Sequence, residues 1–186
     1  LRDECPNRIK IYGSQLLNYS GRYEPIPKSK QLDILLAPSY EKDMHELEKW
    51  FVDILDLMSS LDVGKLVVSL HPNQRGRGQL CKCLERRGYT ADFVSAIGRT
   101  IRHFDIVISG DTTVGFEAAL LGKTVFYYNS RPKVFTYDYV HHPYIIKINK
   151  YDSFAKIYAV IDPTAMHKRY LDFVGLFAGI DGTIRR

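Results

Sequence analysis

The sequence predicts an α/β protein with a Rossmann-like, doubly wound parallel sheet. Three observations support this: short apolar strands alternate with helices, several strands are apolar on both faces, and Gly or Pro stands at the boundaries. Parallel strands need crossover helices, and right-handed crossovers place those helices on both faces of the sheet. A length of 186 residues with 45% hydrophobic content is enough for one domain with a buried core.

The first half of the domain reads as strand, helix, strand, helix and a short third strand. An apolar run without alternation, stopped by Pro38, predicts a buried strand over Leu32–Ala37. Apolar residues then recur at three- and four-residue spacing from Met44 to Leu61, which predicts an amphipathic helix. The other expected elements here are a buried strand over Lys65–Leu70, a basic helix over Gln79–Arg87 and a strand over Asp92–Val94.

The second half repeats this alternation. After one or two helical turns over Gly98–His103, the run DIVIS predicts a buried strand over Asp105–Ser109. The remaining expected elements are a helix over Thr112–Leu121, strands over Lys123–Tyr128 and Tyr144–Ile148, and helices over Ser153–Ile161 and Pro163–Phe177. We interpret residues 1–31 as the end of a preceding domain with a linker, and residues 32–186 as the α/β domain.

Composition narrows the class of protein and its location. No apolar run approaches the eighteen residues of a membrane span. The first residue is Leu and not Met, and no signal-peptide core follows it, so we interpret the chain as a piece of something longer. The three cysteines have neither disulfide-framework nor metal-ligand spacing, so we expect a cytoplasmic protein with no metal site. Residues 71–103 hold seven Lys or Arg against two acids and carry the whole net charge of +5. That segment is either a solvated helix face or a surface for an anionic partner.

Polar residues follow three of the buried strands, where doubly wound sheets bind their ligands. One of the three groups is Asn129, Ser130 and Arg131 after TVFYY. His71 comes directly after KLVVSL, and Arg75 follows in the same loop, where both would reach a phosphate. After DIVIS come Gly110 and Asp111, followed by the hydroxyl pair Thr112 and Thr113 at a helix start. Free amides and the helix dipole at such a start favour an anion, although Asp and Thr are also ordinary helix caps.

Glu117 stands in the otherwise apolar helix that follows. It lies four residues after Thr113 and five after Thr112, so neither pairing makes a capping box. An unpaired carboxylate in such a run is costly, so it needs a ligand hydroxyl pair such as a ribose, or an internal salt bridge. The sequence lacks a P-loop, a GxGxxG turn and a GxSxG elbow, which disfavours the common NTPases, dinucleotide oxidoreductases and α/β-hydrolases.

The motifs LVVSLHPNQR and DIVISGDTTVGFEAALLGKTVFYY together resemble a known family. They are similar to the C-terminal, donor-binding domain of bacterial GT-B glycosyltransferases of capsule and lipopolysaccharide synthesis, one half of the GT-B fold. The closest likeness is to sialyl- and Kdo-transferases that use CMP-sugars, and to CDP-glycerol polymerases. The resemblance covers roughly residues 32–165, and the tail IDGTIRR also looks like the end of such chains.

The resemblance implies a role for each motif residue. His71 would contact the donor phosphate and act in catalysis, Thr112 and Thr113 would hold the same phosphate, and Glu117 would hold the ribose. The domain would bind a nucleotide sugar, a CMP-sugar first, without a metal or other cofactor. The acceptor would be a glycan or a lipid-linked glycan. The catalytic base would lie on a missing N-terminal domain or partner subunit, so this domain would not turn over alone.

Other functions stay open at this stage. We expect the Tyr, Phe and His stretch 126–144 to be exposed, which would suit a non-catalytic or split-subunit module that docks a partner. A CDP-glycerol-type phosphotransferase would use the same sheet and the same phosphate site. Nucleic-acid binding through residues 71–103 is the least favoured alternative, because no RNA-binding signature occurs. Basic residues and the aromatic C-terminal helix also leave peripheral contact with the inner face of the cytoplasmic membrane open.

Overall fold

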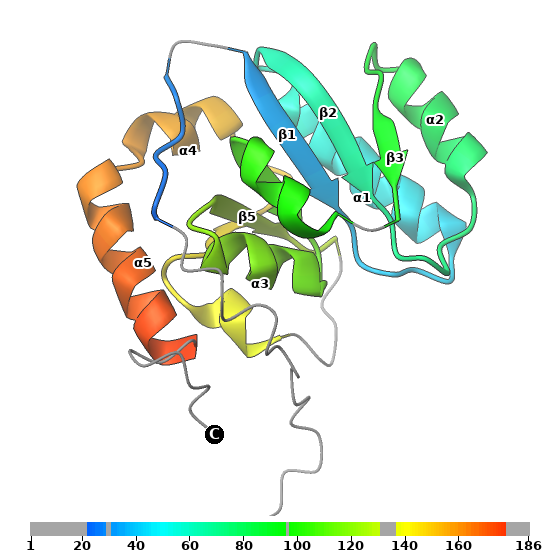
Figure 1. The fold of residues 1–186 in the computed structure, drawn as a ribbon. Coiled ribbons are helices and arrows are strands. Elements are labelled where there is room, and N and C mark those ends of the chain that lie inside the picture. The colour runs from blue at the N-terminus through cyan, green and yellow to red at the C-terminus, as the bar shows by residue number, and fades with distance from the viewer. Residues whose placement is uncertain (1–21, 29–30, 96, 131–136, 178–186) are drawn as a thin grey trace, which may run out of the picture.

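A computed structural model describes residues 22–28, 31–95, 97–130 and 137–177 of the chain. These residues form a six-stranded sheet in the order β3-β2-β1-β4-β5-β6, and every neighbouring pair of strands is parallel (Figure 1). This is the strand order of a Rossmann-type doubly wound sheet. The predicted fold class is confirmed.

The helices and strands fall close to the ranges predicted from the sequence. The strands are β1 (Leu32–Ala37), β2 (Val63–Ser69), β3 (Asp92–Val94), β4 (Ile106–Ser109), β5 (Thr124–Tyr128) and β6 (Ile146–Ile148). The α-helices are α1 (Met44–Met58), α2 (Arg77–Glu85), α3 (Thr113–Leu120), α4 (Phe154–Val160) and α5 (Pro163–Phe177), with 3-10 helices at Gly98–His103 (η1) and Asp138–His141 (η2). Only η2 was not expected. The predicted bounds are found for β1, β3, η1 and α5, and the bounds of the other elements differ by one to three residues.

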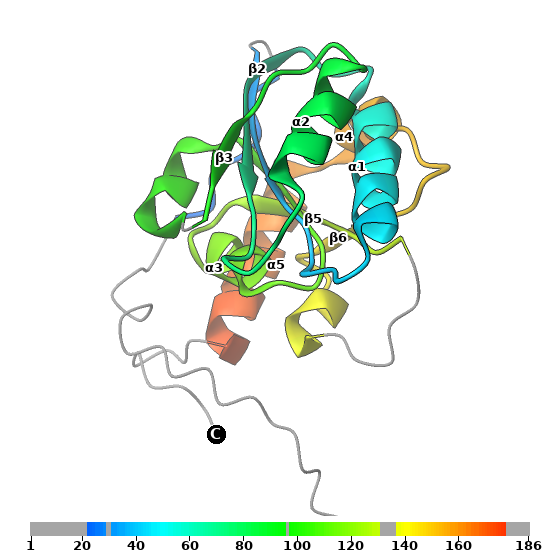
Figure 2. The ribbon, with the colours of Figure 1, turned by 90° about the vertical axis from the view of Figure 1, so that its right-hand side faces the viewer.

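The sheet is covered on both faces because side chains alternate along each buried strand. In β1, Ile34 and Leu36 enter one apolar cluster with residues of α1 and α2, and Leu35 enters a second cluster with residues of α3 and α5. Figure 2 shows α1, α2 and α4 on one side of the sheet and α3 and α5 on the other. The two clusters explain why β1 has no polar face: five of its six residues are buried.

The segment before β1 packs against the α3–β5 turn. Tyr23 and Ile26 are buried, and the Glu24 N–H donates to the Gly122 carbonyl at 3.1 Å. Glu24 also pairs with Lys123, a lysine whose side chain is only 5% exposed. Gly122 has φ +80, and a Cβ there would lie 2.3 Å from the Arg22 carbonyl oxygen, so the close approach requires glycine.

The expectation of an exposed aromatic stretch over residues 126–144 is wrong for the residues that the structure describes. All of β5 is buried, because it lies inside the sheet with helices on both faces. Tyr139 packs on Phe116 of α3 with ring centroids 5.5 Å apart, and Tyr144 packs on Tyr170 of α5 at 5.4 Å. Residues 131–136 lie outside the described part. Most of these aromatic side chains therefore fill the core, whereas Tyr137 is half-buried and His141 is exposed.

In the described part of the chain, the helices are too short or too polar to cross a bilayer.

Candidate functional site

The sheet has a topological switch point between β1 and β4. From β1 the chain runs through α1 to β2, while from β4 it runs through α3 to β5 on the opposite side. The loops that leave these adjacent strands therefore diverge at their carboxyl ends. In open α/β sheets this divergence leaves the crevice in which ligands bind.

A cavity of about 500 Å³ lies at this point of the sheet. Its lining comes from the loops after β1, β2, β3 and β4 and from the first turns of α3. The predicted site residues among the lining are His71, Asp111, Thr112, Thr113 and Glu117. His71 and Glu117, which are 46 positions apart in the sequence, thus line the same cavity. Arg75 and Gly110 do not line it.

The start of α3 forms one wall of the cavity. Thr112 is the N-cap in extended conformation, and its hydroxyl accepts from the Val114 N–H at 3.4 Å, near the long limit for a hydrogen bond. Thr113, the first helical residue, is exposed. Tyr139 donates from its hydroxyl to the Thr112 carbonyl at 2.7 Å and so fixes the first turn from behind. Thr112, Thr113 and Val114 of this helix start line the cavity, and the positive end of a helix dipole favours an anion.

Asp111 holds the loop before α3 in place. Its Oδ1 accepts from the Tyr127 hydroxyl at 2.8 Å, and its Oδ2 accepts from Asn129 Nδ2 at 3.2 Å. Burial, followed by this hydrogen bond to the carboxylate, raises the pKa of Tyr127, so the phenol stays protonated and donating. Both carboxylate oxygens accept hydrogen bonds from residues at the end of β5. Asp111 therefore holds the loop in its conformation, and we do not expect its carboxylate to bind a ligand in the cavity.

Gly110 is required by the close approach of two loops. The Asp111 N–H donates to the hydroxyl of Ser39, just after β1, at 2.7 Å. A Cβ at Gly110 would lie 2.5 Å from Ser39 Oγ and 2.7 Å from the Ser39 nitrogen, which real structures do not allow. The glycine lets the loops after β1 and β4 touch, and its role in this geometry is packing beside the cavity.

His71 lies on the opposite side of the cavity, at the end of β2. Its Nδ1 accepts from the Asn73 N–H at 3.2 Å, so in the neutral ring the proton belongs on Nε2. The Tyr40 ring lies against the imidazole with centroids 5.0 Å apart. Nε2 is thus left as the nitrogen that a ligand in the cavity would meet. Arg75 is exposed in the same loop, outside the lining.

Glu117 brings a carboxyl group to the cavity from the second turn of α3. The side chain is partly buried, and burial raises the pKa of this carboxyl. Within the described ranges, none of the residues donates a hydrogen bond to it or forms an ion pair with it. The alternative of an internal salt bridge is therefore not found in this part of the chain. A desolvated acceptor without a partner suits hydroxyl groups of a ligand.

The arrangement combines an anion-binding helix start, an imidazole donor and an acceptor carboxyl. No three His, Cys, Asp or Glu side chains gather as a metal-binding group among the residues described. Tyr40 and Tyr137 also line the cavity and were not among the predicted site residues. The rule that found His71 would have found Tyr40, since it too follows a buried strand; Tyr137 gave no signal, because it lies far along the chain from any strand end.

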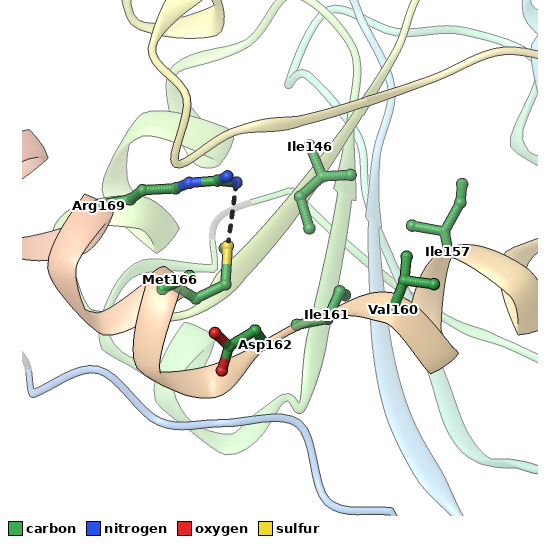
Figure 3. Close-up of a pocket in the computed structure, with 8 residues that line it drawn as sticks. Ile146, Ile157, Val160, Ile161, Asp162, Met166 and Arg169 are labelled. Atoms are coloured by element: carbon green, nitrogen blue, oxygen red, sulfur yellow. Dashed lines mark hydrogen bonds between the residues drawn. The ribbon is translucent and has the colours of Figure 1, made fainter.

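A second, smaller cavity of about 300 Å³ lies beside the edge strand β6. Ile146, at the start of β6, and aliphatic side chains of α4 and α5 line it (Figure 3). Its two charged side chains already have partners: Asp162 accepts from the Thr164 N–H at 2.9 Å, and Arg169 donates to the Pro143 carbonyl at 3.4 Å. This aliphatic cavity lacks the convergent polar groups of the cavity at the switch point.

The similarity of this chain to known proteins lies among the solved structures. No family model matches the chain, and no curated protein does. A crystal structure of a GtfA/B complex superposes on 82% of this chain with a TM-score of 0.48 and 9% sequence identity. The match spans 35% of the length of that chain. At this level of likeness nothing about substrate or activity follows for this protein.

Proposed function

We propose that this domain binds the nucleotide-sugar donor of a glycosyltransferase that builds a bacterial surface polysaccharide. One observation carries the proposal: a single cavity at the switch point of the sheet joins the start of α3, His71 and Glu117. The start of α3 would bind a phosphate, His71 would donate to the leaving-group oxygen, and Glu117 would accept from a pair of sugar hydroxyls. A CMP-sugar is the favoured donor, on the resemblance of the two motifs.

The donor phosphate would lie against the first turn of α3. Backbone amides and the dipole of this helix would neutralise part of its charge, and the hydroxyls of Thr112 and Thr113 would add hydrogen bonds. His71 would donate from Nε2 on the other side. In this proposal the protein itself supplies the neutralisation, without a metal or cofactor.

Glu117 would accept from the ribose hydroxyls. Its carboxyl is partly desolvated and has no partner in the described part of the chain, so a ligand hydroxyl would meet an acceptor that does not have to break an existing bond. The phosphate would then lie one turn of helix away, at Thr113.

The chemistry is transfer of the sugar from phosphate to an acceptor hydroxyl. The bond between the anomeric carbon and the phosphate oxygen breaks, and the electron pair leaves with the phosphate. The acceptor oxygen forms the new bond to the anomeric carbon and loses its proton to a base on another domain or subunit. Donors aimed at the developing phosphate charge lower the barrier, typically by about 2.7–4 kcal/mol for each donor. The acceptor, a glycan or lipid-linked glycan, would reach the donor only when that second part is present.

Calorimetry with CMP, CDP, UDP and GDP tests the proposal. We expect at least one nucleotide to bind more tightly than millimolar. Thr112→Ala should weaken it several-fold, because a lost hydrogen bond is worth about 0.5–1.5 kcal/mol. Ser153→Ala is the matched control, since Ser153 caps α4 by a bond of the same 3.4 Å length and does not line the cavity. Failure of all four nucleotides to bind, or equal losses in both variants, would contradict the proposed function.

A further inference from the structure

The side chain of Gln74 ties the loop after β2 to the loop after β1. The Glu41 N–H donates to Gln74 Oε1 at 3.0 Å, and Gln74 Nε2 donates to the Glu41 carbonyl at 2.9 Å. One amide side chain thus makes a reciprocal pair of bonds with one backbone residue, as a neighbouring strand would. Within its own loop, the Gln74 N–H donates to the His71 carbonyl at 2.8 Å, which closes the turn.

We call this pair of bonds between Gln74 and Glu41 the clamp; it lies next to two rings that line the cavity, those of Tyr40 and His71. Tyr40 directly precedes Glu41, and His71 is the residue whose carbonyl the Gln74 turn binds. Holding the two loops together therefore sets the contact between the Tyr40 and His71 rings, whose centroids are 5.0 Å apart. Asn73, inside the same turn, donates to His71 Nδ1.

Packing of the loop after β2 against α1 also holds the clamp in place. Gly76 has φ +87, and a Cβ there would lie 2.2 Å from Met44 Cε, so the loop after β2 lies directly on the first residue of α1. The exposed fraction of Tyr40 is 43%, so packing alone does not fix its ring. The bonds of Gln74 with Glu41 are hydrogen bonds that join the two loops at this point, and Gln74 Nε2 also lies 3.8 Å from Met44 Sδ at the start of α1.

We propose that Gln74 is a positioning residue that orients His71 for its ligand. Gln74 holds the turn in which the Asn73 N–H donates to His71 Nδ1, so the proton of the neutral ring is on Nε2. It also holds Tyr40 against the imidazole, which orients Nε2 toward a ligand in the cavity. The part of this inference that concerns phosphate rests on the proposed function. The orientation of the ring itself is a property of the free protein and is measurable without any ligand.

Nuclear magnetic resonance on the ligand-free protein tests the orientation. Long-range proton–nitrogen correlations report the tautomer of the neutral His71 ring, and nuclear Overhauser effects report its contact with Tyr40. We expect the wild type to show the Nε2–H tautomer and a Tyr40 contact. Gln74→Met matches the length but removes the two bonds with Glu41 and the weaker contacts of Nε2 with Met44 Sδ and the Arg75 carbonyl, so it should give a mixture of tautomers and a weaker contact. Gln74→Glu keeps the acceptor and loses the donor, so it should be intermediate.

Gln31→Met is the matched control. Gln31 donates to Asp62 at 3.2 Å in an exposed position just before β1, at the amino end of the strand and away from the loops at the carboxyl ends. This variant loses one hydrogen bond between two side chains, whereas the Gln74 bonds join a side chain to the backbone; the His71 signals should not change. Unchanged His71 signals in a folded Gln74→Met protein, or equal changes in both methionine variants, would overturn the proposal.

Nucleotide affinity separates this inference from the proposed function. If the wild type binds CMP, Gln74→Met should weaken the affinity several-fold and Gln31→Met should not. If the wild type binds no nucleotide, the proposed function fails, while the tautomer of His71 still decides whether Gln74 positions the ring. A changed tautomer with unchanged CMP affinity would overturn the phosphate part alone.

Discussion

The hydroxyl of Tyr139 donates to the carbonyl of Thr112 at 2.7 Å, which joins η2 to the residue that begins α3. Tyr139 is 3% exposed, so this bond is shielded from water. Burial also raises the pKa of the phenol, which keeps the hydroxyl a donor. The part of the site that we expect to bind an anion is therefore held from the protein side by a buried contact.

Tyr139→Phe should loosen this helix start and weaken nucleotide binding. Loss of the bond should lower the free energy of unfolding by about 0.5–1.5 kcal/mol. Tyr170→Phe is the control, because the buried Tyr170 hydroxyl donates to the Leu120 carbonyl, at the far end of α3, at 3.1 Å. Denaturant unfolding should show similar losses for both variants, and calorimetry should show weaker nucleotide binding for Tyr139→Phe only. Weaker binding in both would contradict a local role for Tyr139.

Glu117→Gln should stabilise the free protein and weaken nucleotide binding. The substitution removes a partly desolvated charge that has no partner in the described part of the chain. A neutral amide is also a poorer acceptor for two ribose hydroxyls. Thermal unfolding at neutral pH should therefore give a higher Tm than the wild type, while calorimetry gives a higher Kd. A variant that is less stable and binds equally well would show that Glu117 has a structural role.

The stability gained in Glu117→Gln should depend on pH in a defined direction. Because the folded-state pKa of Glu117 is raised above the unfolded value of 4.5, the folded protein binds more protons than the unfolded chain between the two values. Its stability therefore falls as pH rises through that interval. The advantage of the glutamine variant should be near zero below the unfolded pKa and largest at neutral pH. The difference in unfolding free energy, measured by denaturant across this range, checks the sign.

Gly110→Ala should be destabilising although glycine lies in a loop. The new methyl group would collide with backbone and side-chain atoms of Ser39, and such overpacking costs about 1–3 kcal/mol. Gly78→Ala is the control, because a Cβ at Gly78 in α2 meets nothing within 4 Å. It should be neutral or gain up to about 1 kcal/mol from helix propensity. Equal Tm values for the two variants would show that the two loops do not touch as described.

His71→Ala should reduce nucleotide affinity more than any change outside the cavity. A hydrogen bond to a charged phosphate is worth about 1.5–3 kcal/mol, or roughly ten- to a hundredfold in Kd. Because His71 is exposed, the stability of the free protein should change little. His103→Ala provides the comparison, since His103 is exposed in η1 and does not line the cavity. Calorimetry that found the same Kd for both variants would remove His71 from the site.

Much of the fold was predictable because its central strands are buried on both faces. Leu32–Ala37 reads as a continuous apolar run in the sequence, and its closing Pro38 shows where the strand ends. Once the order of strands and helices implies a parallel sheet, the carboxyl ends fall on one edge. His71 and Thr112 could therefore be assigned to a common edge from local patterns alone.

The remaining features depend on contacts between residues far apart in the chain. Nothing near Asp111 in the sequence shows that Tyr127 and Asn129 occupy its carboxylate, and nothing near Gly110 shows that Ser39 crowds it. The tyrosines of residues 126–144 looked like surface residues because aromatic rings with hydroxyls suit both interfaces and cores. Only tertiary packing decides for the core: Tyr139 and Tyr144 pack against α3 and α5, and Tyr128 packs against α1.

The most direct test of the central claim is a crystal structure of the domain with bound CMP. The account predicts the phosphate against the first-turn amides of α3, within hydrogen-bond distance of Thr112 or Thr113 and of His71 Nε2, with the ribose at Glu117. A CMP molecule bound elsewhere, or one that reaches the helix start but lies too far from His71 to touch it, would contradict it.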